Sequence, residues 1–455
     1  MRELLPQKLH ILAQNCPKPL YVVGGAVRDF LAGLHGASFD FDLSSPMRVE
    51  EFLPLATAHG FHAVAVYKNT GTVKFKDESG ADYEYTCFRS DKYIRGLHTP
   101  AEIFFTEDIL LDAKRRDFTA NAVYYDIAKN EFVDPLNGIA AIKEKRLTTV
   151  DNPEKVFGED GLRLMRLARQ AGQLGFTPDE DTKRGAKSNA RLILDISPER
   201  IFAELTLMLR ADEKYGVTYG HYHALKVLDE IDVLEKILPE LSQGKGMAQR
   251  PDFHKYDVLE HSLRATMYAT KEVRLAALLH DVGKPYCVLR DGNSHEHPAE
   301  GARLASEILT RFKAPKKTIA EVSELVFYHM YDFDLKTKEG KLRRFLVEHY
   351  TLIEKLLAVK QADYSGCMDD LSVCPTAKKW QAVIDKMQAE NAPFTLKDLA
   401  VTGKDLAACG FQPATLSTLL HKLLLHAAVN PADNKKSRLL FLAKGFYREI
   451  SKEEV

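Results

Sequence analysis

The sequence predicts an α+β fold, in which a small α/β head precedes a long helical region. Within the first 140 residues, strand-like alternation of apolar and polar residues is interleaved with helical periodicity. From about Asn152 onward the helical period dominates and strand signals nearly vanish. At 455 residues the chain is also too long for one ordinary core, so we expect two to four domains.

The elements expected in the head follow from these two periods. Helices are predicted over residues 6–16, 26–32 and 49–59, and strands over residues 20–23, 39–43, 62–66, 72–75 and 82–88. The run Asp134-Pro135-Leu136-Asn137-Gly138 concentrates residues that interrupt regular structure, and it marks the end of this region.

Two further breaks divide the helical part of the chain. The run Leu241-Ser242-Gln243-Gly244-Lys245-Gly246 predicts a linker, and Ala392-Pro393-Phe394-Thr395 marks a weaker boundary. We therefore expect a head over residues 1–140, a helical neck over 141–245, a body over 246–390 and a tail over 391–455.

Composition limits the cell compartment but not the partner. The chain has 63 basic and 64 acidic residues, so any nucleic-acid binding must come from local basic patches. Six scattered cysteines without a C-x-x-C pair favour a reducing cytosol over a disulfide framework or a cysteine zinc site. No signal core and no stretch of about eighteen apolar residues occurs, which predicts a cytoplasmic protein with no membrane partner. The sequence leaves open whether the protein is a monomer or a homodimer.

Two carboxylates and a glycine pair stand close together near the N-terminus. In the predicted strand 39–43, Asp40 and Asp42 alternate with apolar residues, so their side chains should project from one face. Carboxylates side by side repel unless they share a cation, and Mg²⁺ favours such ligands together with substrate phosphates. Gly24 and Gly25 lack a Cβ and allow a phosphate to approach. The cluster predicts a site for a metal-bound nucleoside triphosphate, although a lone D-x-D is more often a solvated strand edge.

Further charged residues in the head strengthen this interpretation. Glu84 lies in another alternating run and is expected to bring a third carboxylate to the same metals. The run Lys114-Arg115-Arg116-Asp117-Phe118-Thr119-Ala120-Asn121-Ala122 places two guanidinium groups before an apolar segment. A planar guanidinium suits phosphate oxygens, whereas on an ordinary surface it is only a solvated charge.

A charged helix is predicted after the head, over Glu159-Asp160-Gly161-Leu162-Arg163-Leu164-Met165-Arg166-Leu167-Ala168-Arg169. Asp160 and Arg163 are three residues apart, and Glu159 and Arg163 four apart, so each pair is expected to meet on one helix surface. From spacing alone, the favoured interpretation is a solvated face with weak ion pairs. The alternative is that Asp160 and Arg163 offer an acceptor and a two-pronged donor to the Watson–Crick edge of a nucleobase.

A second polar constellation lies in the helical half of the chain. An apolar helix ending at Leu279 is followed by His280 and Asp281, with Gly283 as a stop signal. Imidazole and carboxylate groups presented from several helix ends suit a divalent metal that activates water. The alternative is that each histidine is an ordinary surface or core residue. The full set is His261, His280, Asp281, His297, His329 and Asp363.

These motifs together resemble those of the bacterial CCA-adding tRNA nucleotidyltransferases and their poly(A) polymerase relatives. The resemblance is to class II members that carry an HD domain after the nucleotidyltransferase head. It covers most of the chain and implies a DNA polymerase β-like α/β head, an all-helical neck, an HD body and a tail that contacts tRNA. It also implies CTP, ATP and the tRNA acceptor arm as partners.

The resemblance implies roles for individual residues. Catalysis would depend on Mg²⁺ held by Asp40, Asp42 and Glu84. The nucleotide would be bound by Gly24, Gly25, Arg28, Arg115, Arg116, Asp117, Asn121, Asp160, Arg163 and Arg166. A divalent transition metal in the HD domain would be bound by His261, His280, Asp281, His297, His329 and Asp363. Candidate contacts to RNA phosphates are Lys404, Lys435 and Lys436.

The chain departs from the family pattern in three places. Gln170 follows Arg169 where the family usually has Phe, so packing in the neck is expected to differ. The segment 89–96 keeps only part of the usual acidic and basic pattern, and Ala414 stands where Gly is common.

Several functions fit these motifs. Within nucleotidyl transfer, the alternatives to full CCA addition are a poly(A) polymerase and an enzyme that adds only CC or only A. Outside it, the alternatives are an HD phosphohydrolase whose head merely binds nucleotide and an RNA-binding protein without catalysis. The intact set of Asp40, Asp42 and Glu84 argues against these last two.

Overall fold

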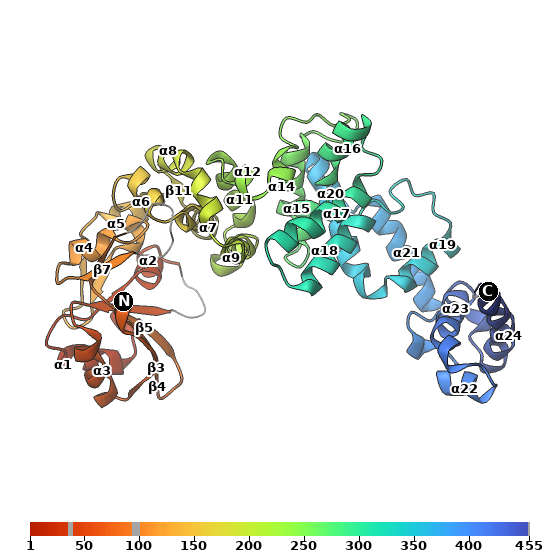
Figure 1. Cartoon of the computed structure of the whole chain (residues 1–455), viewed down its shortest axis with the longest axis horizontal. Helices are drawn as coiled ribbons and strands as arrows, with labels where there is room; N and C mark the ends of the chain where they lie inside the picture. Colours follow the sequence, from red (N-terminus) through yellow and green to blue (C-terminus); the bar gives the residue numbers. More distant parts are fainter. Residues whose placement is uncertain (35–39, 93–100, 454–455) are drawn as a thin grey trace. The chain divides into compact units, whose positions relative to one another are not determined.

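The head is built around one mixed β-sheet (Figure 1). The computed structural model describes residues 1–34, 40–92 and 101–453. The strand order is β3-β4-β5-β2-β1-β8-β9, and β2 and β5 are parallel while the other neighbours are antiparallel. The strands are β1 (Tyr21–Val23), β2 (Phe41–Ser45), β3 (Phe61–Tyr67), β4 (Thr72–Asp77), β5 (Asp82–Cys87), β8 (Tyr124–Asp126) and β9 (Glu131–Val133).

The predicted elements of the head are present, with ends shifted by one or two residues. The helices are α1 (Gln7–Asn15), α2 (Gly25–Leu31), α3 (Val49–Ala58), α4 (Ile109–Lys114) and α5 (Gly138–Lys143). The sequence did not predict the short hairpin β6 (Arg89–Lys92) and β7 (Glu102–Phe105), nor β8 and β9. One prediction needs correction: Asp40 precedes β2 and does not lie within a strand, while residue 39 falls outside the described residues.

Alternation in β5 decides which face of the sheet carries the polar residues. Tyr83 and Tyr85 are buried, whereas Glu84 between them is not. Phe52 of α3 stacks on Tyr85 with ring centroids 3.7 Å apart, so α3 covers the apolar face. Because neighbouring residues in a strand point to opposite faces, Glu84 projects to the other side of the sheet.

The neck is helical, with one short exception. Its main helices are α6 (Pro153–Glu159), α7 (Leu162–Leu174), α8 (Glu180–Ser188), α9 (Pro198–Met208), α10 (Ala211–Tyr215) and α11 (Gly220–Glu230), followed by α12 (Leu234–Ile237) and α13 (Pro239–Ser242). A two-residue parallel bridge joins β10 (Arg146–Leu147) to β11 (Thr177–Pro178). Head and neck form one compact unit, Met1–Gln243 with Ile308–Pro315.

The predicted continuous helix over residues 159–169 is wrong, because the chain breaks between α6 and α7. Asp160 is extended, with φ −144° and ψ 106°, and its carboxylate accepts a hydrogen bond from the Leu162 amide at 2.9 Å. A Cβ on Gly161 would lie 2.6 Å from the Leu192 carbonyl oxygen, so only glycine fits this turn. Asp160 therefore takes a capping role before α7.

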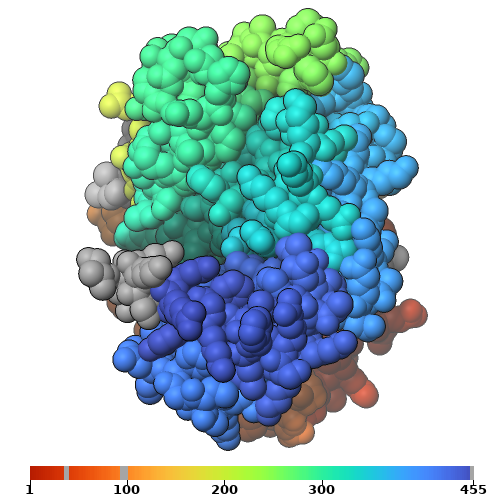
Figure 2. Space-filling view, turned by 90° about the vertical axis from the view of Figure 1, so that its right-hand side faces the viewer, coloured from red at the N-terminus to blue at the C-terminus, as the bar shows by residue number. Residues whose placement is uncertain are grey.

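The second unit, Gly244–Glu307 with Lys316–Val455, is all helical in its described part. Its helices are α14 (Val258–Tyr268), α15 (Arg274–Leu279), α16 (Gly283–Asp291), α17 (His297–Arg311), α18 (Lys316–Tyr328), α19 (Glu339–Glu348), α20 (Ile353–Met368), α21 (Pro375–Ala389), α22 (Gly403–Ala408), α23 (Leu416–Val429) and α24 (Lys436–Glu453). In Figure 2 the last helices of the chain, in dark blue, lie together below the green and cyan helices of the same unit.

The apolar helix before the histidine–aspartate pair ends at Leu279, as predicted. Gly283 does not act only as a stop signal, however, because it begins α16, with Pro285 in the first turn. This arrangement places His280 and Asp281 in the short connection between two helices. Among the described residues, no helix is long and apolar enough to span a membrane.

Candidate functional sites

The carboxylates of the head meet across two parallel strands. Asp42 of β2 is paired in register with Glu84 of β5, so both side chains leave the same face of the sheet. Asp40 is exposed just before β2. At Asp42, burial of the carboxyl raises its pKa to about 6; Arg116 opposes this shift, while Glu84 and Asp40 add to it. The three carboxylates therefore interact electrostatically, as expected for a set that shares a cation.

The glycine pair lies directly beside these carboxylates. Gly24 connects β1 to α2 with φ +82°, a conformation that favours glycine. A Cβ on Gly24 would lie 3.2 Å from Asp42 Oδ2 and 3.9 Å from a guanidinium nitrogen of Arg116. The missing side chain leaves space where the backbone, a carboxylate and an arginine converge.

A strongly basic cavity of about 470 Å³ opens at this point. Eight basic side chains against four acidic ones line it, so it is suited to a polyanion. Its lining residues are Gly24, Gly25, Arg28, Asp42, Arg89, Asp91, Arg115, Arg116, Asp117, Asn121, Asp160, Arg163, Arg166, Arg169, Gln170, Gln173 and Lys214.

A buried carboxylate that the sequence did not single out organises the arginine pair. Asp112 accepts from Arg115 Nε at 2.7 Å and from Arg116 Nη2 at 3.2 Å, and Tyr124 donates to it at 2.6 Å. Burial by itself raises its pKa, but the two arginines more than offset this and hold the pKa at about 2. The spacing of three and four residues along α4 was the signal that could have revealed this anchor.

Asp160 and Arg163 both reach the cavity wall, and both are buried. Arg163 donates to the carbonyl oxygens of Val156 at 2.8 Å and Arg115 at 2.7 Å, and to Glu159 at 3.0 Å. The interpretation of this segment as a solvated surface face is therefore wrong. The spacing argument identified the contact with Glu159 correctly, even though the helix is interrupted.

On one side of the cavity, Arg28 donates to Asp29 at 2.6 Å and to the Asn121 side-chain carbonyl at 2.6 Å. Tyr215 donates to the same aspartate. On the other side, Arg166 forms an ion pair with Asp117 at 2.7 Å. Predicted residues from α2, the segment after α4, and α7 thus come together at one cavity.

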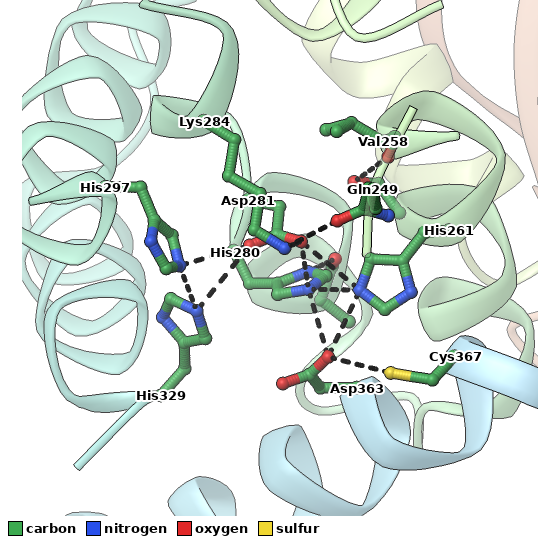
Figure 3. Close-up of polar contacts among 12 residues, drawn as sticks. Gln249, Val258, His261, His280, Asp281, Lys284, His297, His329, Asp363 and Cys367 are labelled. Carbon is green, nitrogen blue, oxygen red and sulfur yellow. Dashed lines mark hydrogen bonds and ion pairs between the residues drawn. The ribbon is translucent and has the colours of Figure 1, made fainter. Parts of the chain in front are cut away.

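The histidines and aspartates of the second unit form one cluster, in which all members except Asp363 are buried (Figure 3). Its first group is His261, His280 and Asp363, and its second is Asp281, His297 and His329; in each, one ligand atom per residue lies within 4.8 Å of the others. Asp281 contacts both groups, because its two oxygens lie 3.2 Å from His261 Nε2 and 3.3 Å from His297 Nε2.

Backbone carbonyls orient three of the histidines. The Nδ1 atoms of His280, His297 and His329 lie 2.7, 2.6 and 2.6 Å from carbonyl oxygens three residues earlier. A carbonyl only accepts, so Nδ1 carries the proton and Nε2 faces the cluster. This is the arrangement that supporting groups impose on metal-binding imidazoles.

The charges in the cluster are strongly coupled. Burial lowers the pKa of His280, but Asp281 and Asp363 raise it to about 10. Burial lowers the pKa of His329 to about 4, although Asp281 opposes this shift. Lys284, which the sequence reasoning missed, donates to Asp281 at 2.6 Å. The two groups offer nitrogen and oxygen donors, a set that fits divalent transition metals, whereas the all-oxygen set of the head fits Mg²⁺.

The three lysines predicted to contact RNA lie in the tail and are exposed. Lys404 is in α22 and Lys435 precedes α24. Lys436 forms an ion pair with Asp405 at 2.5 Å. All six cysteines are free, and Cys367 lies 3.9 Å from Asp363 beside the histidine cluster.

Comparison with family models matches three consecutive regions of the chain. A poly A polymerase head domain matches residues 20–148, a probable RNA and SrmB-binding site of polymerase A matches residues 175–244, and an HD domain matches residues 257–365.

Relatives of known function cover different lengths of the chain. It is 31% identical to an A-adding tRNA nucleotidyltransferase of Deinococcus radiodurans over 365 residues, which is 76% of each protein. It is 38% identical to a CCA-adding enzyme of Geobacillus kaustophilus over 189 residues, which is 42% of this chain and 45% of that enzyme. Among solved structures, a CCA-adding enzyme of Bacillus stearothermophilus in complex with CTP matches over 98% of each chain with a TM-score of 0.66. At 24% identity, this match supports the fold.

Proposed function

Because this chain belongs to the family of tRNA nucleotidyltransferases, we propose that it adds or repairs the 3′-terminal C-C-A of tRNA from CTP and ATP. No nucleic-acid template is required in this proposal. The observation that carries it is the register of Asp42 and Glu84 beside Gly24, with Gly24 and Asp42 lining a basic cavity of about 470 Å³. The same proposal assigns the protein to the cytoplasm, where these substrates occur together.

Asp40, Asp42 and Glu84 are the residues that would hold Mg²⁺. When bound there, the metal would neutralise the triphosphate and favour ionisation of the attacking tRNA 3′-hydroxyl. Gly24 allows the phosphates to approach the backbone, and Arg116 lies beside them. Arg115 and Arg116 are held in place by Asp112, so their positions are set before the nucleotide enters.

Asp160 and Arg163 would select the base. Asp160 offers a carboxylate acceptor and Arg163 a guanidinium, and both line the cavity while anchored to the backbone. Such a rigid pair can match the hydrogen-bonding edges of C and A and leave buried groups unpaired with G and U. Changing Asp160 and Arg163 to Ala should relax base choice more than it slows transfer of a permitted base. Unchanged selectivity in tRNA extension assays with each single nucleotide would contradict this role.

The partition of the chain into regions of different function is part of the proposal. A catalytic head over residues 1–140, a neck over 141–245, an HD domain over 246–390 and a tail over 391–455 are supported by the matched ranges 20–148, 175–244 and 257–365. In the tail, Lys404, Lys435 and Lys436 would contact phosphates of the tRNA acceptor arm without reading sequence. Binding should then weaken steeply as salt increases.

One alternative within the family has specific support. The relative that aligns with 76% of this chain is an A-adding tRNA nucleotidyltransferase, whereas the CCA-adding relative of Geobacillus kaustophilus aligns over 42%. Incubating tRNAs that end before, within and after CCA with both nucleotides, and sequencing the products, separates the two activities. Full addition to a tRNA without CCA supports our proposal, and extension of only the CC-ending tRNA supports the alternative.

A second activity is favoured by the histidine–aspartate cluster. Two sets of nitrogen and oxygen donors share Asp281, and Asp363 is the member with the most exposed side chain, at 21%. A metal held there can supply an activated water for phosphate-ester hydrolysis. Phosphate release from nucleotide substrates with Mn²⁺ or Ni²⁺, lost on Asp281→Asn, would establish this hydrolase, and absence of release with either metal would contradict it.

A further inference from the structure

Gln170 stands where the family resemblance leads us to expect phenylalanine, and the structure gives this glutamine a set of polar partners. Its side chain is 4% exposed and lines the basic cavity. It lies on α7, one helical turn after Arg166, and therefore follows the base-selecting segment directly. A buried polar side chain needs partners, so its contacts indicate what it does.

The carbonyl oxygen of Gln170 serves the phosphate side of the cavity. It accepts from the Asn121 amide at 3.0 Å and from Arg28 Nη1 at 3.4 Å. Asn121 also accepts from Arg28 through its own carbonyl oxygen, at 2.6 Å. Arg28, Asn121 and Gln170 thus form a closed triangle of hydrogen bonds next to the Gly24-Gly25 turn.

The amide nitrogen of Gln170 serves the other side of the cavity. It donates to Asp117 Oδ2 at 3.5 Å, the same oxygen that pairs with Arg166 at 2.7 Å. Asp117 also accepts from the Asn121 amide at 2.8 Å. Gln170 and Asn121 therefore form two parallel links between the arginine of α2 and the arginine of α7.

We propose that Gln170 is a positioning residue that couples the phosphate side of the cavity, at Arg28, to the base side, at Arg166. This inference rests on the proposed nucleotidyltransferase function and deepens it. A phenylalanine at this position has no acceptor for Asn121 or Arg28 and no donor for Asp117. In this chain, loss of the amide would leave both arginines less firmly placed and would weaken binding and selection of the nucleotide.

The substitutions Gln170→Leu and Gln170→Glu test the coupling in the full chain. Leu keeps the size of the side chain and removes its hydrogen bonds, so we expect KM for CTP and ATP to rise about tenfold while kcat changes little, because two to three hydrogen bonds to buried or charged groups are lost. Misincorporation of UTP should rise together with KM. Gln14→Leu, an exposed position on α1, is the matched control and should behave as wild type.

Gln170→Glu allows a second measurement, the pH dependence of nucleotide binding, which should not change if Gln170 serves only for packing. An ionised glutamate would repel Asp117 and attract Arg28, whereas a protonated one has the same donor and acceptor pattern as glutamine. Nucleotide binding by this variant should therefore recover as pH falls, and the Gln170→Leu defect should show no such recovery. Recovery in Gln170→Glu alone supports the proposal.

The result that overturns the proposal is a Gln170→Leu protein with wild-type KM and selectivity, or one whose melting temperature alone falls. Calorimetry measures the affinity of each variant for CTP and ATP, and so tests the coupling in the absence of turnover. If the wild-type protein extends no tRNA, the proposed function fails. If the wild-type protein binds CTP and Gln170→Leu binds it equally well, the coupling fails instead.

Discussion

The head and the histidine–aspartate cluster of the second unit surround their carboxylates with different cations. In the head, Arg115 and Arg116 hold the pKa of Asp112 at about 2, whereas Asp42 in the cavity wall has a pKa of about 6. In the cluster, histidines take the place of arginines, and the pKa of His280 rises to about 10 beside Asp281 and Asp363. Guanidinium groups are permanently charged, whereas an imidazolium can release a proton to solvent and bind a metal through the freed nitrogen. The first arrangement suits a metal-bound polyanion, and the second suits metal ions themselves.

The largest expected effect comes from removing a head carboxylate. Asp42→Ala should lower nucleotide incorporation by about three orders of magnitude, because Glu84 and Asp40 alone cannot hold the metal and the triphosphate in place. Binding of tRNA should persist. Incorporation of labelled CTP and filter binding of tRNA measure the two properties. Asp82→Asn, an exposed position at the start of β5, is the control, and residual activity of the Asp42 variant near wild type would refute the metal role.

We expect a substitution in the histidine–aspartate cluster to impair metal binding there without impairing nucleotide incorporation at the head. Asp281→Asn should lower metal affinity of the cluster by roughly a hundredfold or more, since a neutral amide replaces the one carboxylate whose two oxygens contact the two ligand groups. Incorporation of nucleotides should remain within about twofold of wild type. Metal titration monitored by calorimetry and tRNA extension give the two readouts. Asp291→Asn, exposed at the end of α16, is the control, and an equal loss of both activities would show that the sites are coupled.

A backbone substitution tests the break between α6 and α7. In Gly161→Ala, the added Cβ would meet the Leu192 carbonyl oxygen at 2.6 Å, which we expect to destabilise the fold by about 2 kcal/mol. The shift of Asp160 should also reduce discrimination against UTP. Gly445→Ala in α24, where the Cβ meets nothing within 4 Å, should leave stability unchanged or slightly increased. Denaturant unfolding compares the two, and equal stability would mean that the turn accepts a side chain.

The smallest effect concerns pH. Because the pKa of Asp42 is raised to about 6, the carboxylate is protonated as pH falls through this value and its affinity for a cation declines. Protons and Mg²⁺ then compete for the same oxygens. At limiting Mg²⁺, incorporation should fall off near pH 6, and this acid limb should move to lower pH when Mg²⁺ is increased. An acid limb that does not respond to Mg²⁺ would separate the titrating group from the metal site.

Local motifs were sufficient to predict most of the head and its site. The alternation of apolar and polar residues in β2 and β5 correctly predicted that Asp42 and Glu84 lie on the polar face of the sheet. Because Tyr83 and Tyr85 must be buried, Glu84 between them has to point to the opposite face. Strands β8 and β9 were missed because neither alternates: β8 is buried throughout, and both exposed residues of β9 are neighbours. Asp112 was missed because no helix was predicted over residues 109–114, and its spacing to Arg115 and Arg116 has meaning only on a helix.

Other features depend on contacts between distant segments. The spacing of Glu159 and Arg163 fits a continuous helix, and only the close approach of Leu192 to Gly161 shows why the helix must break. From the sequence, Gln170 was only a departure from the phenylalanine usual in the family. Its partners Arg28 and Asn121 are 142 and 49 residues away in the sequence, so its role could not be predicted. In the second unit, the histidines and aspartates were predicted as one metal-binding set, but their separation into two groups around Asp281 depends on how the helices fold.

A crystal of the full chain grown with CTP and Mn²⁺ provides the most direct test of the difference between the two sites. Anomalous scattering should place metal between Asp42 and Glu84, with the triphosphate beside Gly24 and the base toward Asp160 and Arg163. In the histidine–aspartate cluster, metal should be present without nucleotide. CTP bound away from the basic cavity, or bound within it with no metal at Asp42, would contradict our account.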